Sequence, residues 1–330
     1  MRYLLVLIVI CFSHVVTAQL SMEERSFVDT NYLHGWKSAS GKVLVPGTYH
    51  LPLRYYGYGF VGIANENYKW GLLDTNGKVI IPPSYEAIGM FNEGMALVIN
   101  KGQKNFYLDS TGKEIHFNLD FDKSYSVYEG MIQVMKNNRW GFMNTKGELV
   151  IPFKYDNVRA FSNGYAPVAL DSIVTASGEK TPLWGYIDKS GKEVIAPVYT
   201  AVSSSVGEGL FPVSVSDPFN KDPRMITWGY VNSLGKLVIP YRFNRAYSFS
   251  EGIALVCIGK TTSSSGKWGF INKHQQFIFP PIECAIIYGS GKEFKETGVA
   301  QVIRTNNASS ANNSYFIDRS GKKVVKKHNQ

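Results

Sequence analysis

The sequence predicts an all-β protein built from tandem repeats of short antiparallel strands. Three observations lead to this prediction. First, the dipeptide Trp-Gly recurs in one frame, at Trp70, Trp140, Trp184, Trp228 and Trp268. Second, glycine, proline and aromatic residues recur at fixed distances after it. Third, short β-branched and aromatic runs alternate with turn signals, and no amphipathic helix of useful length interrupts them. Such a fixed period is the signature of a repeat architecture.

The tryptophan position marks the start of each repeat. Glycine stands seven residues later, as at Gly77 and Gly191, and an aromatic residue such as Tyr85 stands fifteen residues later. Proline stands twelve residues later in most repeats. The same frame reveals repeats that lack the tryptophan. It predicts seven full repeats and a fraction, which start at His34, Trp70, Asn105, Trp140, Trp184, Trp228, Trp268 and, for the truncated one, Ser314.

Each repeat is expected to fold into four short strands. The first runs from Trp184 to Asp188 in the clearest case. The turn after it supplies a glycine for positive φ and begins at Asp or Asn, whose side chain bonds the turn backbone. The second strand ends at a proline, since proline cannot donate to a ladder. The third and fourth are expected over Tyr85 to Phe91 and Met95 to Ile99.

The tryptophan side chain is expected to fill space between neighbouring repeats. The glycine after it would let a backbone or a ring approach closely. Two repeats shift the bulky side chain by one residue, as Asn105-Phe106 and Ser314-Tyr315. In a strand this shift turns the ring to the other face.

Four strands per repeat and about seven repeats favour a β-propeller, whose blades are four-stranded sheets. The remaining hairpin from Ser314 to Val325 would then close the ring against the first repeat. An open β-solenoid, which stacks repeats in a row, is the alternative.

The N-terminus has the pattern of a secretory signal peptide over residues 1–18. Arg2 supplies positive charge, Tyr3 to Phe12 is apolar, and Val16-Thr17-Ala18 is a small-residue cleavage site. A lipobox ending at Cys11 is the competing interpretation. No later stretch is apolar for long enough to span a membrane. The chain is therefore divided into the signal peptide, an N-terminal lead-in (19–33), the repeat array (34–325) and a C-terminal tail (326–330), with a secreted, periplasmic or cell-surface location.

Charge and cysteine content exclude several classes of protein. The formal net charge is +9, and lysine follows glycine in most predicted turns, which spreads the charge along the array. A nucleic acid partner is not expected, because no clustered basic stripe occurs. Cys257 and Cys284 are too few for a disulfide framework. Two buried thiols are favoured over one bridge between them.

No catalytic, metal-binding or cofactor-binding set is predicted. Gly57 to Gly62 matches GxGxxG, but its aromatic neighbours and the repeat frame favour a strand. The histidines lack zinc-ligand spacing. Asp120 and Asp122 would lie on the same face of a strand. Either this face is simply exposed to solvent or the two carboxylates form a catalytic site. The glutamates before the strand-opening glycines belong to the repeat; they are Glu93, Glu129, Glu208 and Glu251.

The chain resembles the WG-repeat (KWG-repeat) family at Lys69-Trp70-Gly71, Arg139-Trp140-Gly141 and Lys267-Trp268-Gly269. The third of these has Gln275 where the turn glycine is expected. The resemblance covers residues 34 to 325. It implies an often exported, largely bacterial module for binding or scaffolding, without shared catalytic residues.

The predicted function is an exported, non-enzymatic interaction or scaffold module that presents a repeat-built surface to a protein or polysaccharide partner. The binding candidates are three tyrosines, Tyr55, Tyr56 and Tyr58. They belong to an aromatic run for which strand core and packing between repeats is the favoured interpretation. Long connections from Asp171 to Pro182, Asp217 to Thr227, Lys260 to Lys267 and Arg304 to Asn313 are a second candidate face. The alternative is an exported carbohydrate-active hydrolase with carboxylates in a propeller channel.

Overall fold

The computed structural model describes residues 26–324, apart from residues 39, 175–177, 179, 216–226, 263–264, 285, 289–297 and 304–313. The predicted signal peptide and the C-terminal tail lie outside the described residues. In the described part, no helix is long and apolar enough to cross a membrane. The chain divides into two compact units, one of residues 1–137 with 142–149 and one of residues 138–141 with 150–330.

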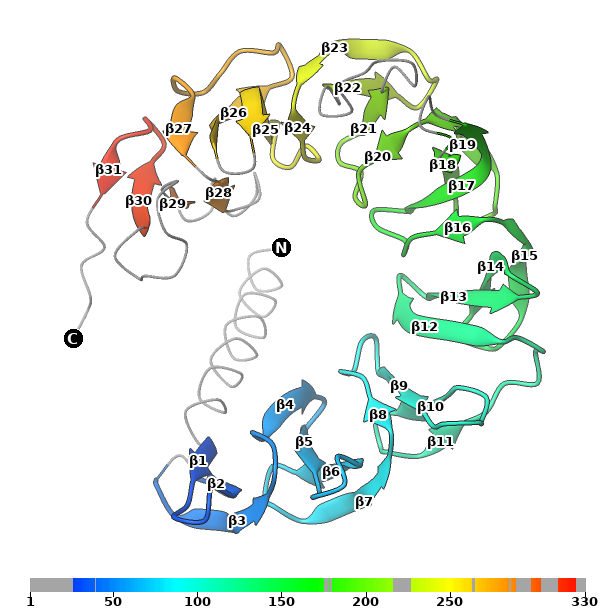
Figure 1. Ribbon diagram of the computed structural model, residues 1–330, viewed down its shortest axis with the longest axis vertical. Helices are drawn as coiled ribbons and strands as arrows, with labels where there is room; N and C mark the ends of the chain where they lie inside the picture. The colour runs from blue at the N-terminus through cyan, green and yellow to red at the C-terminus, as the bar shows by residue number, and fades with distance from the viewer. Residues whose placement is uncertain are drawn as a thin grey trace, which may run out of the picture. The chain divides into compact units, whose positions relative to one another are not determined.

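The described residues form eight antiparallel sheets, each a meander of strands in chain order (Figure 1). The first sheet has three strands and the other seven have four. Among the described strands, no ladder joins one sheet to the next. Self-contained four-stranded meanders are the blades of propeller-type folds. The predicted all-β, propeller-like repeat class is confirmed, with eight sheets in place of seven repeats and a fraction.

The sheets of the first compact unit follow one another along the chain. The first sheet contains β1 (Ser26–Val28), β2 (His34–Lys37) and β3 (Val43–Tyr49). The second contains β4 (Arg54–Gly57), β5 (Phe60–Ala64), β6 (Trp70–Asp74) and β7 (Val79–Tyr85). The third contains β8 (Ala87–Ile88), β9 (Met95–Ile99), β10 (Phe106–Asp109) and β11 (Glu114–Ile115). The fourth, where the unit boundary falls, contains β12 (Lys123–Tyr128), β13 (Met131–Lys136), β14 (Arg139–Asn144) and β15 (Leu149–Tyr155).

The second compact unit continues with four more sheets of the same order. The fifth contains β16 (Asn157–Val158), β17 (Tyr165–Val174), β18 (Lys180–Asp188) and β19 (Glu193–Tyr199). The sixth contains β20 (Ala201–Val202), β21 (Leu210–Val215), β22 (Thr227–Asn232) and β23 (Leu237–Phe243). The seventh contains β24 (Arg245–Ala246), β25 (Ile253–Thr262), β26 (Ser265–Asn272) and β27 (Ile282–Cys284). The eighth contains β28 (Ile286–Tyr288), β29 (Val299–Ile303), β30 (Ser314–Asp318) and β31 (Lys323–Val324).

The sheets are offset by half a repeat from the frame that starts at tryptophan. β7 ends the second sheet at Tyr85, and β8 opens the third sheet at Ala87, inside the strand predicted from Tyr85 to Phe91. Each sheet therefore takes two strands from one sequence repeat and two from the next. The tryptophan position lies in the third strand of its sheet. The predicted boundary was wrong because turn spacing sets a period but does not tell where the chain leaves one sheet for another.

The same offset changes the role of both ends of the array. The hairpin of β30 and β31 pairs with β29 and completes the eighth sheet, so it is not a separate fraction of a repeat. Closure of a ring by this hairpin against the first repeat stays a prediction. The lead-in supplies β1, which pairs with β2. The choice between a closed ring and an open row stays a prediction.

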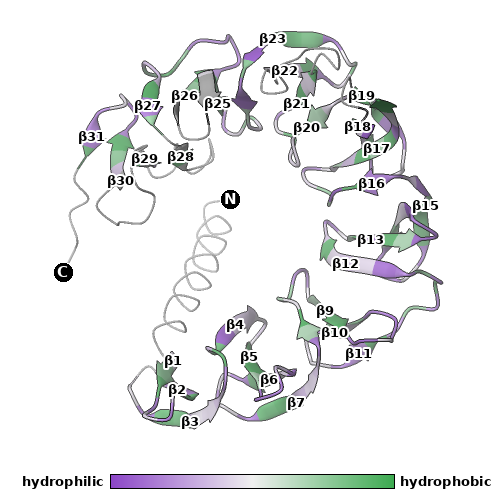
Figure 2. Cartoon of the chain, in the orientation of Figure 1, coloured by the Kyte–Doolittle hydropathy of each residue, from purple (hydrophilic) through white to green (hydrophobic). Residues whose placement is uncertain are grey.

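The second strands are buried on both faces. All five residues of β5 and the first four of β9 are buried. Their sequences are accordingly apolar throughout instead of alternating, as for strands with neighbours on both sides, and Figure 2 colours β9 as hydrophobic. Between the second and third sheets, Leu72 and Ile81 pack with Ala96 and Val98 in one cluster. Side-chain packing therefore joins neighbouring sheets.

The turn after the third strand is held by its first side chain, as predicted. The Oδ1 atom of Asp188 accepts the N–H groups of Ser190 at 2.9 Å and Lys192 at 3.1 Å. Gly191 follows in the left-handed region, at a φ of 82°. In the seventh sheet Gln275 takes this conformation at 67°, although it is not glycine.

The glycine of Trp-Gly permits a close backbone approach. A Cβ atom on Gly185 would lie 2.3 Å from the carbonyl oxygen of Ile195 in the fourth strand. A Cβ on Gly71 or Gly141 would lie 2.4 Å from the equivalent oxygens. The register between third and fourth strands shifts at this point. The close backbone approach was predicted from the sequence, and the structure adds that the fourth strand bulges over the glycine.

The third sheet shows what happens without this glycine. In this sheet Phe106 of the third strand pairs with Val98 of the second. In the second sheet the equivalent residue of the third strand is Gly71, which pairs with Ile63. The fourth strand, β11, has only two residues, whereas β7 and β19 have seven. The displaced ring is buried in the cluster shared with the second sheet and stacks on His116 at 4.8 Å. Asn105, at the tryptophan position, donates instead to the carbonyl oxygen of Ser124 in the fourth sheet, so the two side chains face opposite ways, as predicted.

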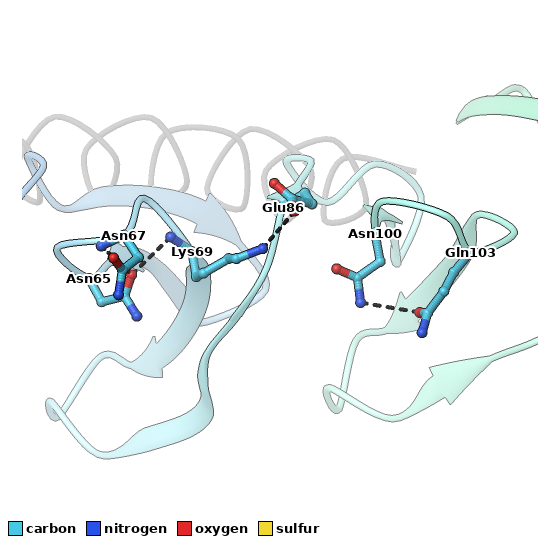
Figure 3. A network of polar contacts seen from close by, with 6 residues as sticks. All are labelled: Asn65, Asn67, Lys69, Glu86, Asn100 and Gln103. Atoms are coloured by element: carbon cyan, nitrogen blue, oxygen red, sulfur yellow. Dashed lines mark hydrogen bonds and ion pairs between the residues drawn. The ribbon is translucent and has the colours of Figure 1, made fainter.

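The basic residue before tryptophan pairs with the linker between two sheets. Lys69 Nζ lies 2.6 Å from the carboxylate of Glu86, which stands between β7 and β8 (Figure 3). Arg139 pairs with Asp156 at the same place after β15, at 2.5 Å. In both cases the ion pair fastens the chain where it crosses to the next sheet.

Tyrosine hydroxyls tether some sheets to their neighbours. Tyr186 in β18 donates to the carbonyl oxygen of Ser203 at 2.9 Å, and Tyr230 in β22 donates to that of Tyr247 at 2.8 Å. Both acceptors directly follow the first strand of the next sheet. Both tyrosines are fully buried, and burial raises the pKa of each hydroxyl above its ordinary value.

Glutamate before the strand-opening glycine forms a second tether. Glu93 and Gly94 both have positive φ, 49° and 81°, as a two-residue hairpin of type I′ requires. The Glu93 carboxylate accepts the N–H of Gly130 at 2.7 Å, and Glu208 accepts that of Gly252 at 2.7 Å. These acidic residues therefore belong to the repeat, as predicted, and each reaches the hairpin of the following sheet.

Cys257 and Cys284 are free and buried, as favoured from the sequence. They lie in β25 and β27, which flank β26.

We expect Gly185→Ala to lower the free energy of unfolding by about 1–3 kcal/mol, because its Cβ would press on a backbone oxygen. Gly269→Ala is the matched control, since its Cβ would meet the Phe277 ring at 2.9 Å and that side chain is able to shift. Urea unfolding of both variants tests this. Equal losses would contradict the role given to the backbone contact.

We expect Tyr186→Phe to cost about 1–2 kcal/mol at pH 8, because the buried oxygen of Ser203 loses its donor. The raised pKa means that the unfolded chain loses the phenolic proton near pH 10 while the folded chain keeps it. The free energy of unfolding therefore falls above about pH 10. In Tyr186→Phe this fall should be less steep, and the two slopes should differ by up to about 1.4 kcal/mol per pH unit.

Urea midpoints between pH 8 and 11 measure both effects. Tyr68→Phe, at a tyrosine that is 65% exposed, is the control that should change neither. An unchanged pH slope in Tyr186→Phe would count against this assignment.

Candidate functional site

One position differs between sheets whose tryptophan is buried and a sheet whose tryptophan is partly exposed. It is the residue that lies opposite the third residue after the strand-opening glycine. Arg159 N donates to Pro167 O at 2.9 Å and Ser203 N to Pro212 O at 3.1 Å, and in the second sheet Arg54 pairs with Gly62. We call it the covering position. Its described occupants in the tryptophan-containing sheets with unambiguous register are Arg54, Arg159, Ser203 and Tyr247.

In the fifth and seventh sheets, a large side chain at the covering position lies against a buried tryptophan of the same sheet. The Arg159 guanidinium lies 4.4 Å from the ring of Trp184, which is 7% exposed. The ring of Tyr247 lies 6.3 Å from that of Trp268, which is 3% exposed. In the sixth sheet the covering residue is Ser203, which is too short to cross the indole, and Trp228 stays only partly buried.

The uncovered Trp228 lines a cleft of about 460 Å³ in the second compact unit. One wall is the first strand of the sixth sheet with Ser203 and Ser204, and the other is the first strand of the seventh with Arg245 and Tyr247. Arg159 reaches this cleft from the fifth sheet. The cleft therefore combines an aromatic face, hydroxyl groups and two guanidinium groups.

A second cleft occupies the same place in the repeat within the first compact unit. It has a volume of about 770 Å³ and lies between β4 and β8, with Trp70 in its lining. Arg54 takes the covering position there and is exposed. Tyr56 stacks on Trp70 with ring centroids 6.1 Å apart. Leu53 and Met90 also line this cleft.

The structure brings two of the three predicted tyrosines to this cleft. Tyr55 lines it, and its hydroxyl oxygen accepts the N–H of Gly59 at 3.1 Å. Tyr56 lines it as well, although it is 7% exposed, and burial raises its pKa to about 12. Tyr58 lies in the hairpin between β4 and β5, 55% exposed, and is not among the lining residues.

Five cleft residues were missed from the sequence: Trp70, Trp228, Arg54, Arg159 and Arg245. The tryptophans were assigned to packing alone, which holds for Trp184 and Trp268. The signal was available in the repeats aligned on their strand-opening glycine. Five residues before that glycine the neighbouring sheets have Arg159 and Tyr247, whereas the sixth sheet has Ser204, directly after Ser203.

The long connections all join the second strand of a sheet to the third. The one after Val168 continues as a hairpin, in which Ser172 pairs with Pro182 and Val174 with Lys180. Residues 216–226 and 304–313 of two others lie outside the described residues. A partner face on these connections stays a prediction.

The acidic candidates make structural contacts. Asp120 pairs with Lys136 at 2.6 Å, and Asp122 accepts the N–H of Asn137 at 2.8 Å. The bond from Lys136 holds the pKa of Asp120 below its ordinary value. Neither cleft has a carboxylate among its described lining residues. The described residues also contain no group of three His, Cys, Asp or Glu side chains arranged to hold a metal ion.

Comparison with known proteins identifies the repeat type. The model of the WG containing repeat matches five segments, residues 70–103, 107–140, 140–172, 184–217 and 228–261. No curated protein matches the chain.

Several solved structures are similar in fold. A eukaryotic initiation factor shares 11% identity over 91% of this chain and 94% of its own, with a TM-score of 0.44. A quinonprotein alcohol dehydrogenase-like protein from Bacteroides thetaiotaomicron shares 12% over 74% and 68%, with a TM-score of 0.35. Apo AztD from Citrobacter koseri shares 13% over 83% and 92%, with a TM-score of 0.33. Similarity at this level carries no information on function.

We expect Ser203→Arg to cover Trp228 as Arg159 covers Trp184. In protein labelled with 5-fluorotryptophan, a soluble paramagnetic chelate should broaden the ¹⁹F signals of Trp70 and Trp228 more than those of Trp184 and Trp268. Single Trp→Phe variants assign the signals. Ser203→Arg should protect Trp228 and leave Trp70, the internal control, unchanged. Equal broadening of all four indoles would refute the exposure pattern.

Proposed function

This chain belongs to the WG-containing repeat family, and we propose that it is an exported, non-enzymatic module that binds a polysaccharide in its tryptophan clefts. One observation carries the proposal: the partly buried indole of Trp228 packs against the core and also forms part of a cleft wall, beside hydroxyl and guanidinium groups. A flat aromatic face suits the apolar face of a sugar ring, and nearby polar groups suit its hydroxyls.

Repetition supports a polymeric partner. The two clefts occupy the same place in the repeat, between the first strands of neighbouring sheets. A polymer with a repeating unit suits a protein that presents one type of site more than once, because linked weak contacts add to avidity. A protein partner, which the sequence left open, is an outcome of the test below.

Export is part of the proposal and comes from residues 1–18, with their positive, apolar and small-residue segments. Extracytoplasmic polysaccharides would be the accessible partners at that location.

We expect Trp70→Ala and Trp228→Ala each to weaken polysaccharide binding by about tenfold or more, because truncating a buried aromatic anchor costs more than about 1 kcal/mol. Tyr32→Ala, at an aromatic side chain that is 85% exposed outside both clefts, is the matched control. The protein from Gln19 onward would be tested on a glycan array, with affinity electrophoresis for each positive polymer.

Capture by proteins alone, or glycan binding that both tryptophan variants retain, would contradict the proposal. Release of reducing ends from a bound polymer would favour the hydrolase alternative.

A further inference from the structure

Arg159 is held rigidly at the edge of the Trp228 cleft. Its Nη1 donates to the carbonyl oxygen of Val202 at 2.8 Å and to Ser204 Oγ at 3.3 Å, and its guanidinium plane rests on Trp184. The side chain is half-buried. Among the described residues no carboxylate pairs with it. A partly desolvated guanidinium without a counter-ion is a ready partner for an oxyanion.

A second guanidinium lines the same cleft. Arg245 belongs to the opposite wall, is exposed, and has no carboxylate partner among the described residues. The lining otherwise supplies Ser203, Asn244 and the ring of Tyr247, which is 41% exposed. No described lining residue offsets the two positive charges, so the cleft favours a negatively charged guest.

We infer that the Trp228 cleft selects an acidic sugar, whose carboxylate or sulfate pairs with Arg159 and Arg245 while its ring contacts the indole. The inference rests on the proposed function and narrows it to anionic polymers. The planar fork of a guanidinium matches both oxyanions. The cleft beside Trp70 is not included, because Arg54 is the one arginine among its described lining residues.

Two matched pairs of polymers separate this inference from the proposed function. Polygalacturonate is compared with the same polymer after carboxyl reduction, and dextran sulfate with dextran. We expect an acidic member to bind about tenfold or more tightly than its neutral counterpart, since one charge-assisted contact of about 1.4 kcal/mol corresponds to tenfold. The first pair tests the carboxylate and the second the sulfate.

Three glutamine variants locate the effect. Arg245→Gln and Arg159→Gln should each reduce this preference at least severalfold. Lys236→Gln, which removes the same charge from an exposed turn, should leave it unchanged. Arg159→Gln removes a side chain that packs on Trp184 and therefore could change the local packing. Arg245 is exposed, so Arg245→Gln tests the charge without this effect. Arg159→Lys, which keeps the charge without the fork, should restore part of the preference.

Each outcome separates the two claims. The inference would be overturned if the neutral and the acidic member of a pair bound equally well. If Trp228→Ala abolished that equal binding, the proposed function would stay in place. An equal loss in all three glutamine variants would also overturn the inference, because bulk charge would then explain the preference. Binding of no member of either pair would overturn both.

Discussion

The missing Cβ of the glycine after tryptophan is the constraint on which each full-length sheet depends. A Cβ there would stand 2.3–2.6 Å from a carbonyl oxygen of the fourth strand at Gly71, Gly141, Gly185 and Gly229. Its absence lets the fourth strand bulge across the third and still run for seven residues. The tryptophan then pairs with the aromatic residue of that strand, as Trp184 does with Tyr199. Where Phe106 replaces the glycine, the fourth strand shrinks to two residues.

Neighbouring sheets are joined by side chains, since no described ladder connects them. The tyrosine hydroxyls and the glutamate carboxylates bond backbone groups of the following sheet. The tyrosine tethers hold the carbonyl groups of Ser203 and Tyr247, which are also residues of the Trp228 cleft. The walls of this cleft are therefore positioned by buried hydrogen bonds. A guest that fits would meet groups already in place, which lowers the entropy cost of binding.

The repeat uses one position for packing in some sheets and leaves it open in others. Trp184 and Trp268 are covered by Arg159 and Tyr247, whereas Trp228 lies beside Ser203 and is not. In the fifth to seventh sheets, the side chain at the covering position therefore separates a core residue from a cleft residue, whereas in the second sheet Arg54 is exposed and Trp70 still lines a cleft. Arg159 serves both purposes, because it covers Trp184 and also lines the cleft of the next sheet. Divergence at this position would change binding without disturbing the strand pattern.

The sequence by itself determined the β class, the repeat period, the turns and the role of the glycine, because these depend on contacts a few residues apart. The turn from Asp188 to Gly191, for example, is held by a hydrogen bond to the Asp188 side chain and by the positive φ of Gly191. The tertiary structure decided the sheet boundaries and the completion of the eighth sheet by β30 and β31, because ladder pairing between distant strands sets them. It also decided which tryptophans are open. Exposure depends on the side chain that crosses the indole from another strand, so identical Trp-Gly motifs have different surroundings, and the three tyrosines proposed from sequence gave only part of one cleft.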